Sequence, residues 1–464
     1  MSQVNRSLLP EHLLTWIEDT LDGEIARIKP RAGGGAVRSG AEVDVRTRDG
    51  EVTRGFLAYD GGQRAMEGTT EKYRREASIL NALADTEIRA PRLLASSAEL
   101  RAHLFEFVAG EDRFARISDP DEAMAVAKEF VHELAKLHRL DPATLPLEGF
   151  GSIEAPADTI RRRIDAMERE HAAAGPEDPF IVYGLEWLKR NVPDYDGPVA
   201  VVHGDAGPGN FLFEDGRINV VLDWELSHLG DPLEDFAWMS IRAIIQAWVP
   251  FAPLLEEYER VSGIPVDLER IRFYRLYTLL GMIVGSHRRF FQEPEKLADQ
   301  GRLGGGLMFA MVHRRAYVHG LADAMGLTLP EVALPEAPPT GTEPFLDSVL
   351  TQIRDVIVAR TDDQVVAETA KDSARVLKYV ILRQRLEPAL RADERDDLSN
   401  VLGTSFEDAG SARRALVERI RRDGLDDATM IGILWRRVSR ETAMMRDSMG
   451  ALAERVFPPL EAGD

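Results

Sequence analysis

Apolar residues alternate with polar ones in some parts of the chain and recur with a helical period in others. Near the N-terminus, an amphipathic helix is predicted by four apolar residues at helical spacing: Leu13, Leu14, Ile17 and Leu21. Residues 42–48 and 51–60 flank an Asp49-Gly50 pair, which predicts a β-hairpin. Residues 70–83 predict a helix, and residues 90–94 and 103–108 predict two more strands. We therefore expect a small sheet with one helix against it.

Beyond residue 110 the helical period dominates. Helices are predicted at 123–140, 159–173, 267–291 and 307–325, with one β island at 199–225. Four prolines in the eleven residues 334–344 indicate a linker. After it, helices are predicted at 345–366, 371–387, 411–420 and 430–449. The expected domains are a small lobe (1–110), a large helical lobe (111–333), the linker (334–344) and a separate all-helical domain (345–464).

Composition narrows the class of protein. The 464 residues include 57 Lys and Arg against 78 Asp and Glu, a net charge of −21, which argues against nucleic acid as the main partner. Cysteine is absent, so disulfides, thiolate metal sites and cysteine nucleophiles are excluded. The longest apolar stretch, 276–285, is about half of what a membrane helix needs, and residues 7–17 lack a signal-peptide core. We expect a cytoplasmic protein without a membrane partner.

The most informative segment lies at residues 203–225. Residues 211–213 and 218–222 flank Asp215-Gly216, a strong hairpin signal. The expected register pairs residue 213 with 218, 211 with 220 and 210 with 221. Asn210 and Asp223 would then be diagonal neighbours about 7–8 Å apart, close enough to share a Mg²⁺ ion. Asp205 lies five residues before Asn210, in the loop that leads into the hairpin.

This residue set suits phosphoryl transfer. One carboxylate can orient a substrate hydroxyl and accept its proton, while an Asn and a second Asp hold magnesium on the nucleotide phosphates. His203-x-Asp205-x4-Asn210, followed by Asp223, has the spacing of the protein-kinase catalytic arrangement. The alternative is a surface hairpin whose Asp, Gly and Asn residues serve only turn formation.

The motifs resemble those of the aminoglycoside-phosphotransferase-like kinases over roughly residues 20–330. The resemblance is carried by His203-Gly-Asp-Ala-Gly-Pro-Gly-Asn210, Leu222-Asp-Trp-Glu225 and Gly230-Asp-Pro-Leu-Glu-Asp-Phe-Ala237. Leu134-Ala-Lys-Leu-His-Arg-Leu-Asp141, Leu185-Glu-Trp-Leu188 and Tyr73-Arg-Arg-Glu76 add to it. These flanking segments are similar to the branch related to kinase domains fused with acyl-CoA dehydrogenases.

The resemblance implies an α+β, bilobal protein-kinase-like fold, with Mg²⁺ and ATP (or GTP) as cofactors. It implies that Asp205 is the catalytic base, that Asn210 and Asp223 are metal ligands, and that His203 and Glu225 support them. Glu76 would pair with the nucleotide-binding cation. Gly33, Gly34 and Gly35 would form the phosphate loop, and the backbone of the hinge, including Glu106, Phe107 and Val108, would meet adenine. Asp231 and Asp235 are interpreted as helix caps or turn formers.

One departure concerns the small-lobe lysine that contacts the nucleotide phosphates in these kinases. The expected strand positions hold Ala58 and Tyr59, and the chain has no Lys between Lys29 and Lys72. Arg54 and Arg46 are candidate replacements. The sequence therefore leaves two functions open: a kinase for a hydroxyl of a small molecule, with a hydroxyacyl-CoA suggested by the fused relatives, or a pseudokinase-like binding module.

Two further expectations concern surfaces. Arginine-rich segments such as 161–163, 287–289 and 313–315 are normally solvated helix faces, and one of them is a candidate contact for an anionic group such as a coenzyme A phosphate. The C-terminal helices are expected to pack on the kinase lobe or to form a homodimer interface.

Overall fold

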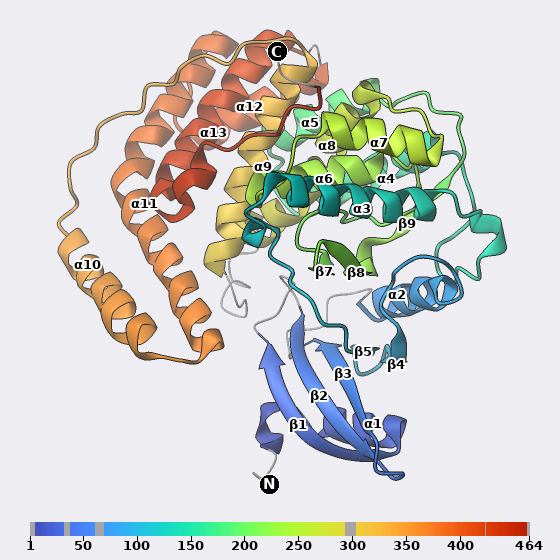
Figure 1. Ribbon diagram of the computed structural model, residues 1–464. Coiled ribbons are helices and arrows are strands. Elements are labelled where there is room, and N and C mark those ends of the chain that lie inside the picture. The colour runs from blue at the N-terminus through green and yellow to red at the C-terminus, as the bar shows by residue number, and fades with distance from the viewer. Residues whose placement is uncertain (1–4, 32–37, 61–68, 293–302, 423, 462–464) are drawn as a thin grey trace. The chain divides into compact units, whose positions relative to one another are not determined.

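The computed structural model describes residues 5–31, 38–60, 69–292, 303–422 and 424–461 (Figure 1). The chain forms two compact units. Unit 1 comprises residues 1–156, 196–266 and 459–464, and unit 2 comprises residues 157–195 and 267–458. In the described part of the chain, no helix combines the length and apolar character that crossing a membrane requires.

Unit 1 begins with α1 (Glu11–Leu21) and a five-stranded antiparallel sheet in the order β1-β2-β3-β5-β4. The strands are β1 (Gly23–Arg31), β2 (Ser39–Thr47), β3 (Val52–Tyr59), β4 (Leu93–Ser97) and β5 (Ala102–Glu106). The predicted hairpin is present as β2 and β3. Strand β1 was not predicted, because charged residues occupy many of its positions and only Ile25 is buried.

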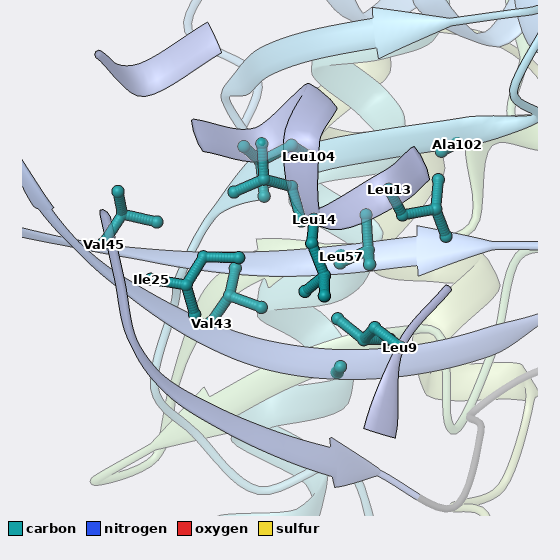
Figure 2. Packing of buried hydrophobic residues seen from close by; sticks show 11 residues of the cluster. Leu9, Leu13, Leu14, Ile25, Val43, Val45, Leu57, Ala102 and Leu104 are labelled. Carbon is teal, nitrogen blue, oxygen red and sulfur yellow. The ribbon is translucent and has the colours of Figure 1, made fainter. Parts of the chain in front are cut away.

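The small core of this sheet is apolar. Figure 2 shows Leu13 and Leu14 of α1 packing against Val43, Leu57 and Leu104 of the sheet. Through this packing, α1 covers one face of the sheet. The predicted helix is α2 (Thr69–Leu83), which buries Tyr73 and Glu76.

The remainder of unit 1 surrounds two small β elements. Strands β6 (Ala200–Val202) and β9 (His228–Gly230) pair, as do β7 (Phe211–Glu214) and β8 (Arg217–Val221). The helices are α3 (Pro120–His138), α6 (Glu234–Ile245) and α7 (Ala252–Ser262). Short helices occur at η1 (Arg6–Leu8), η2 (Phe114–Arg116), η3 (Pro142–Thr144) and η4 (Trp224–Leu226).

Unit 2 contains helices only, among the residues that the structure describes. They are α4 (Pro156–Ala173), α5 (Pro179–Arg190), α8 (Leu268–His287), η5 (Arg288–Gln292), α9 (Leu303–Ala324), α10 (Glu343–Gln352), η7 (Ile353–Val358), α11 (Gln364–Leu402), α12 (Ala409–Arg422), α13 (Asp427–Met449) and η8 (Gly450–Ala453). Helices α9, α11 and α13 run beside one another (Figure 1). The predicted end of α11 at residue 387 is wrong, because the helix continues through Pro388 for a total of 39 residues.

Candidate active site

In unit 1, a glycine-rich loop connects β6 to β7. This loop contains the predicted site residues His203, Asp205 and Asn210. Gly204 has φ +81°, and a Cβ there would collide with the carbonyl oxygen of Leu226. Only glycine therefore fits this position without a backbone shift. The turn leaves Asp205 partly exposed at the surface of the loop, while Asn210 is buried at its end.

The carboxylate of Asp205 is held from two sides. Asn210 Nδ2 donates to Asp205 Oδ2 at 2.7 Å and to its backbone oxygen at 2.7 Å. Arg242 of α6 places Nη1 at 2.9 Å from both carboxylate oxygens, and its Nε donates to the Pro208 carbonyl at 2.8 Å. A charge-assisted contact of this kind orients a carboxylate. Sequence reasoning missed Arg242, which lies 37 residues from Asp205 in a helix with no motif of its own.

His203 holds the same loop through two hydrogen bonds. Its Nε2 donates to the Leu222 carbonyl at 2.8 Å, and its Nδ1 accepts the Asp205 N–H at 3.2 Å. This arrangement requires the neutral Nε2–H tautomer. Burial lowers the pKa of His203 and so favours the same neutral form.

The interpretation of Asp235 as a helix cap or turn former is wrong. Its two carboxylate oxygens accept the backbone N–H groups of His203 and Gly204, each at 2.9 Å, and His138 Nε2 lies 3.0 Å away. Burial opposes ionisation, but the His138 contact and the neighbouring charges keep the pKa of Asp235 low. Asp231 does act locally, since Oδ1 accepts the Leu233 N–H at 2.9 Å. Asp235 is thus a positioning residue for the loop that contains Asp205.

The hairpin has the predicted turn but a different register. Phe213 pairs with Ile218 as predicted, whereas Phe211 pairs with Val221 rather than Val220. An irregularity between Leu212 and Phe213 causes the shift. Asn210 consequently lies opposite Leu222, whose N–H donates to its carbonyl at 2.8 Å.

Asp223 follows directly after Leu222, in the left-handed conformation with φ +60°. Its side chain is exposed. Even so, the surrounding protein removes enough water to raise the pKa of Asp223 to about 7, and the charges of Asp205, Glu225 and Glu76 add to this effect. The carboxylate lacks an attractive partner strong enough to reverse the shift. A cation bound at this position would favour its charged form.

The donor set at this position fits Mg²⁺ bound together with a nucleotide. Because Nδ2 of Asn210 is used on Asp205, its Oδ1 is the atom left for a cation. Within the described ranges, no group of three or more His, Asp or Glu residues could hold a metal ion by itself. Magnesium commonly takes one or two carboxylates and completes its shell with phosphates and water. The amide and the Asp223 carboxylate match that use.

A second group of charges lies around Glu76 of α2. Arg38, directly before β2, places Nη2 at 2.5 Å from Glu76 Oε2 and at 2.7 Å from Glu225 Oε2. His103 Nε2 lies 3.3 Å from the same Glu76 oxygen. Burial alone would raise the pKa of Glu76, but His103 and Arg38 lower it to about 2. The partner of the helix glutamate is therefore an arginine from the start of β2.

Neither candidate replacement for the lysine reaches Glu76 in the described structure. Arg54 lies 3.4 Å from Asp44 and stacks its guanidinium 4.1 Å from the Phe107 ring centroid. Arg46 lies in register with Val52 at the far end of the hairpin. A signal for Arg38 was present in the sequence, since it lies three residues after the glycine run 33–35.

The remaining predicted residues fall at two places. Glu106 ends β5, and Phe107 donates its N–H to the Arg54 carbonyl at 3.2 Å, with Val108 next along the chain. The predicted phosphate loop, Gly33, Gly34 and Gly35, lies outside the described residues. The adenine and phosphate contacts of these residues stay predictions.

Comparison with known proteins gives a match over about half of the chain. Residues 47–274 match the model of the Phosphotransferase enzyme family. The crystal structure of a Ralstonia eutropha protein assigned as an aminoglycoside phosphotransferase superposes with a TM-score of 0.53 and 20% identity, covering 68% of this chain and 98% of that one. The predicted α+β kinase-like fold, with a helical C-terminal region, is thereby confirmed.

Curated relatives point to the predicted branch. Human acyl-CoA dehydrogenase family member 11 is 35% identical over 160 residues, which are 33% of this chain and 20% of that protein. Mouse acyl-CoA dehydrogenase family member 10 is 27% identical over 214 residues, 44% of this chain and 20% of that protein. The matches span about a fifth of the length of these two relatives.

Proposed function

We propose that this protein is a kinase that transfers the terminal phosphoryl group of ATP (or GTP) to a hydroxyl group of a small molecule. The observation that carries the proposal is the grouping of Asp205, Asn210 and Asp223 on one loop and hairpin. Phosphoryl transfer needs a carboxylate for the acceptor hydroxyl and oxygen ligands for the metal on the phosphates. All three groups lie in unit 1, within the part that matches the model of the Phosphotransferase enzyme family.

The chain's own residues divide the work. The acceptor oxygen forms a bond to the γ-phosphorus while the bond from that phosphorus to the β–γ bridging oxygen breaks, and nucleoside diphosphate leaves. Asp205 orients the acceptor hydroxyl and takes its proton, and Arg242 and Asn210 keep that carboxylate in place. Asn210 and Asp223 would hold Mg²⁺, which supplies charge neutralisation on the phosphates when bound.

Arg38 is proposed to replace the missing lysine as the cation on the nucleotide phosphates. Its contact with Glu76 reproduces the cation–glutamate pair of kinases from a position directly before β2. A guanidinium also offers paired donors that match phosphate oxygens. This replacement weakens the main argument for a pseudokinase-like binding module, which was the missing lysine.

The acceptor is proposed to be a hydroxyacyl-CoA. Support comes from the names of the two mammalian relatives, both acyl-CoA dehydrogenase family members. A direct comparison of a hydroxyacyl-CoA, the free hydroxy acid and an aminoglycoside as acceptors tests this choice. Equal rates with the acyl-CoA and the free acid would mean that the protein does not recognise the coenzyme A part of the acceptor.

The kinase itself is tested by calorimetric titration of ATP with and without Mg²⁺, followed by a phosphorylation screen. Asp205→Asn should bind MgATP and lose about 10²–10⁴-fold in turnover, since a positioned proton acceptor contributes that much. The matched control, Asp215→Asn, changes an exposed aspartate in the turn of the same hairpin and should keep full activity. MgATP binding without turnover on any hydroxyl substrate would favour the binding module, and no binding at millimolar ATP would refute the kinase.

A further inference from the structure

A second concentration of charge lies in a cavity of about 480 Å³ whose walls belong entirely to unit 2. The walls come from the segment before α5 and from helices α8, α9, α11, α12 and α13. Among the described residues, seven arginines and five carboxylates line it. This balance is the opposite of the chain as a whole, which carries a net charge of −21.

Two carboxylates of the cavity wall, Asp178 and Glu441, are shared by two arginines. Asp178 accepts from Nη1 and Nη2 of Arg437, each at 2.7 Å, and Arg314 Nη2 lies 3.9 Å away. Glu441 accepts from Nε of Arg314 at 2.7 Å and from Nε of Arg437 at 3.1 Å. Burial opposes ionisation of Asp178, but the charges of Arg437 and Arg314 hold its pKa well below the usual range. These acids are therefore anions that fix two arginines in place.

The outer wall repeats the arrangement on α11. Glu387 accepts from Arg383 at 2.8 Å and from Arg391 at 2.7 Å, so one carboxylate again serves two guanidinium groups. Arg440 pairs at 2.5 Å with Asp397, which does not line the cavity. Arg414 of α12 adds an exposed guanidinium at the rim. The arginines of the cavity wall thus outnumber its carboxylates, and the wall carries an excess of positive charge.

Two buried donors among these arginines have no hydrogen-bond partner in the described structure. They are Nη1 of Arg314, whose side chain is 3% exposed, and Nε of Arg440, whose side chain is 10% exposed. Leaving a buried donor unsatisfied is destabilising, and more so when the group is charged. Phe180 packs 4.2 Å from the Arg314 guanidinium, but a ring over its face leaves the in-plane N–H directions open.

We infer that this cavity binds a small organic molecule through a phosphate group. A phosphate presents several oxygens in a geometry that guanidinium groups from different helices can match together. It would satisfy the unused donors and balance the surplus positive charge. The volume exceeds what a single phosphate needs, and Tyr379, Leu390 and Met444 give the cavity apolar surface for the rest of a ligand.

The sequence pattern anticipated one of these residues. Arg314 belongs to the arginine-rich segment 313–315, one of the segments that the sequence offers as candidate contacts for an anionic group. The competing explanation is that the arginines and carboxylates only join the helices of unit 2. That explanation predicts no affinity for phosphate beyond the effect of ionic strength.

The test uses pyrophosphate as the probe. EDTA is present to remove divalent cations, so that the carboxylates around Asp205 repel pyrophosphate from the proposed kinase site. Binding is followed by calorimetry and by ³¹P line broadening at constant ionic strength. The double variant Arg391→Gln/Arg414→Gln removes two arginines at the rim of the cavity, both exposed, so folding should be retained. We expect at least about tenfold weaker binding than in the parent protein.

The control is the single variant Arg395→Gln, which removes one positive charge from α11 at a residue that does not line the cavity. It should bind pyrophosphate as the parent protein does. Asp205→Asn should also leave this binding unchanged, which separates the cavity from the proposed kinase site. Absence of pyrophosphate binding, or equal weakening by Arg395→Gln and the double variant, would overturn the inference.

Discussion

Asp178 and Asp223 are both surrounded by charged side chains, yet their environments differ in sign. Asp178 is buried in unit 2 against two arginines, which keep its pKa low. Asp223 is exposed in unit 1 among carboxylates, and its pKa is raised to about 7. Among the described residues, the charges of Arg437 and Arg314 outweigh burial at Asp178, whereas the charge of Arg242 does not outweigh burial and the neighbouring carboxylates at Asp223.

This difference separates a structural carboxylate from one prepared for a ligand. When the chain supplies both charges of a buried ion pair, removing one partner leaves the other charge buried and uncompensated, which destabilises the unit in which it lies. A carboxylate close to other carboxylates is destabilised in its charged form, and a bound cation would relieve this repulsion. Groups with such perturbed pKa values concentrate at functional sites.

The largest effect is expected at Asp223. Asp223→Asn keeps a residue type that tolerates the left-handed backbone but removes the charge that would hold magnesium. We expect turnover to fall about 10³-fold or more, while thermal stability is retained because the neighbours are also negative. Steady-state kinetics and a melting curve measure both. A lowered melting temperature with unchanged turnover would reverse the assignment.

The opposite outcome is expected at Asp178. Asp178→Asn can still cap α5 at the Phe180 N–H, but it leaves Arg437 without its main countercharge. Breaking one side of a buried pair costs about 3–5 kcal/mol of unfolding free energy. Chemical denaturation measures it. Asp158→Asn, which breaks an exposed pair with Arg161, should change stability by only about 0–1 kcal/mol.

A smaller effect on nucleotide binding is expected at Arg38. Arg38→Met should raise KM for ATP about tenfold or more, because a charge-assisted phosphate contact is lost, and Arg38→Lys should recover part of it. Arg54→Met removes an arginine from the neighbouring strand and serves as the control. If Arg54→Met raised KM and Arg38→Met did not, the assignment of the nucleotide cation would move to Arg54.

The smallest effect concerns the pH dependence of unit 2. Burial lowers the pKa of His313 to about 4 from its usual 6.5, so the unfolded chain binds this proton more readily than the folded chain. The contribution is fully present above about pH 6.5 and is lost as the pH falls towards 4, by at most about 3 kcal/mol. In denaturation curves, His313→Phe should flatten this acid limb. The exposed control His12→Phe should leave it unchanged.

The sequence predicted the parts of the site that depend on local chemistry. The Asp215-Gly216 turn and the spacing from His203 to Asn210 identified the hairpin and the loop. The register of β7 and β8 could not be predicted, because the irregularity at Leu212 has no signature of its own. Arg242 and Arg38 reach the site through tertiary packing over 37 and 38 residues, a distance that motif spacing does not constrain.

Arg38 already contacts two anions, Glu76 and Glu225. Both contacts use Nη2, so a phosphate that binds through this nitrogen would have to displace one of the two carboxylates, and Glu225 is the more exposed of them. Binding would then be an exchange of one anion for another at the same guanidinium, and the released Glu225 would raise the local negative charge beside Asp223. The added negative charge would favour binding of the divalent cation, so nucleotide and cation would bind to this protein together.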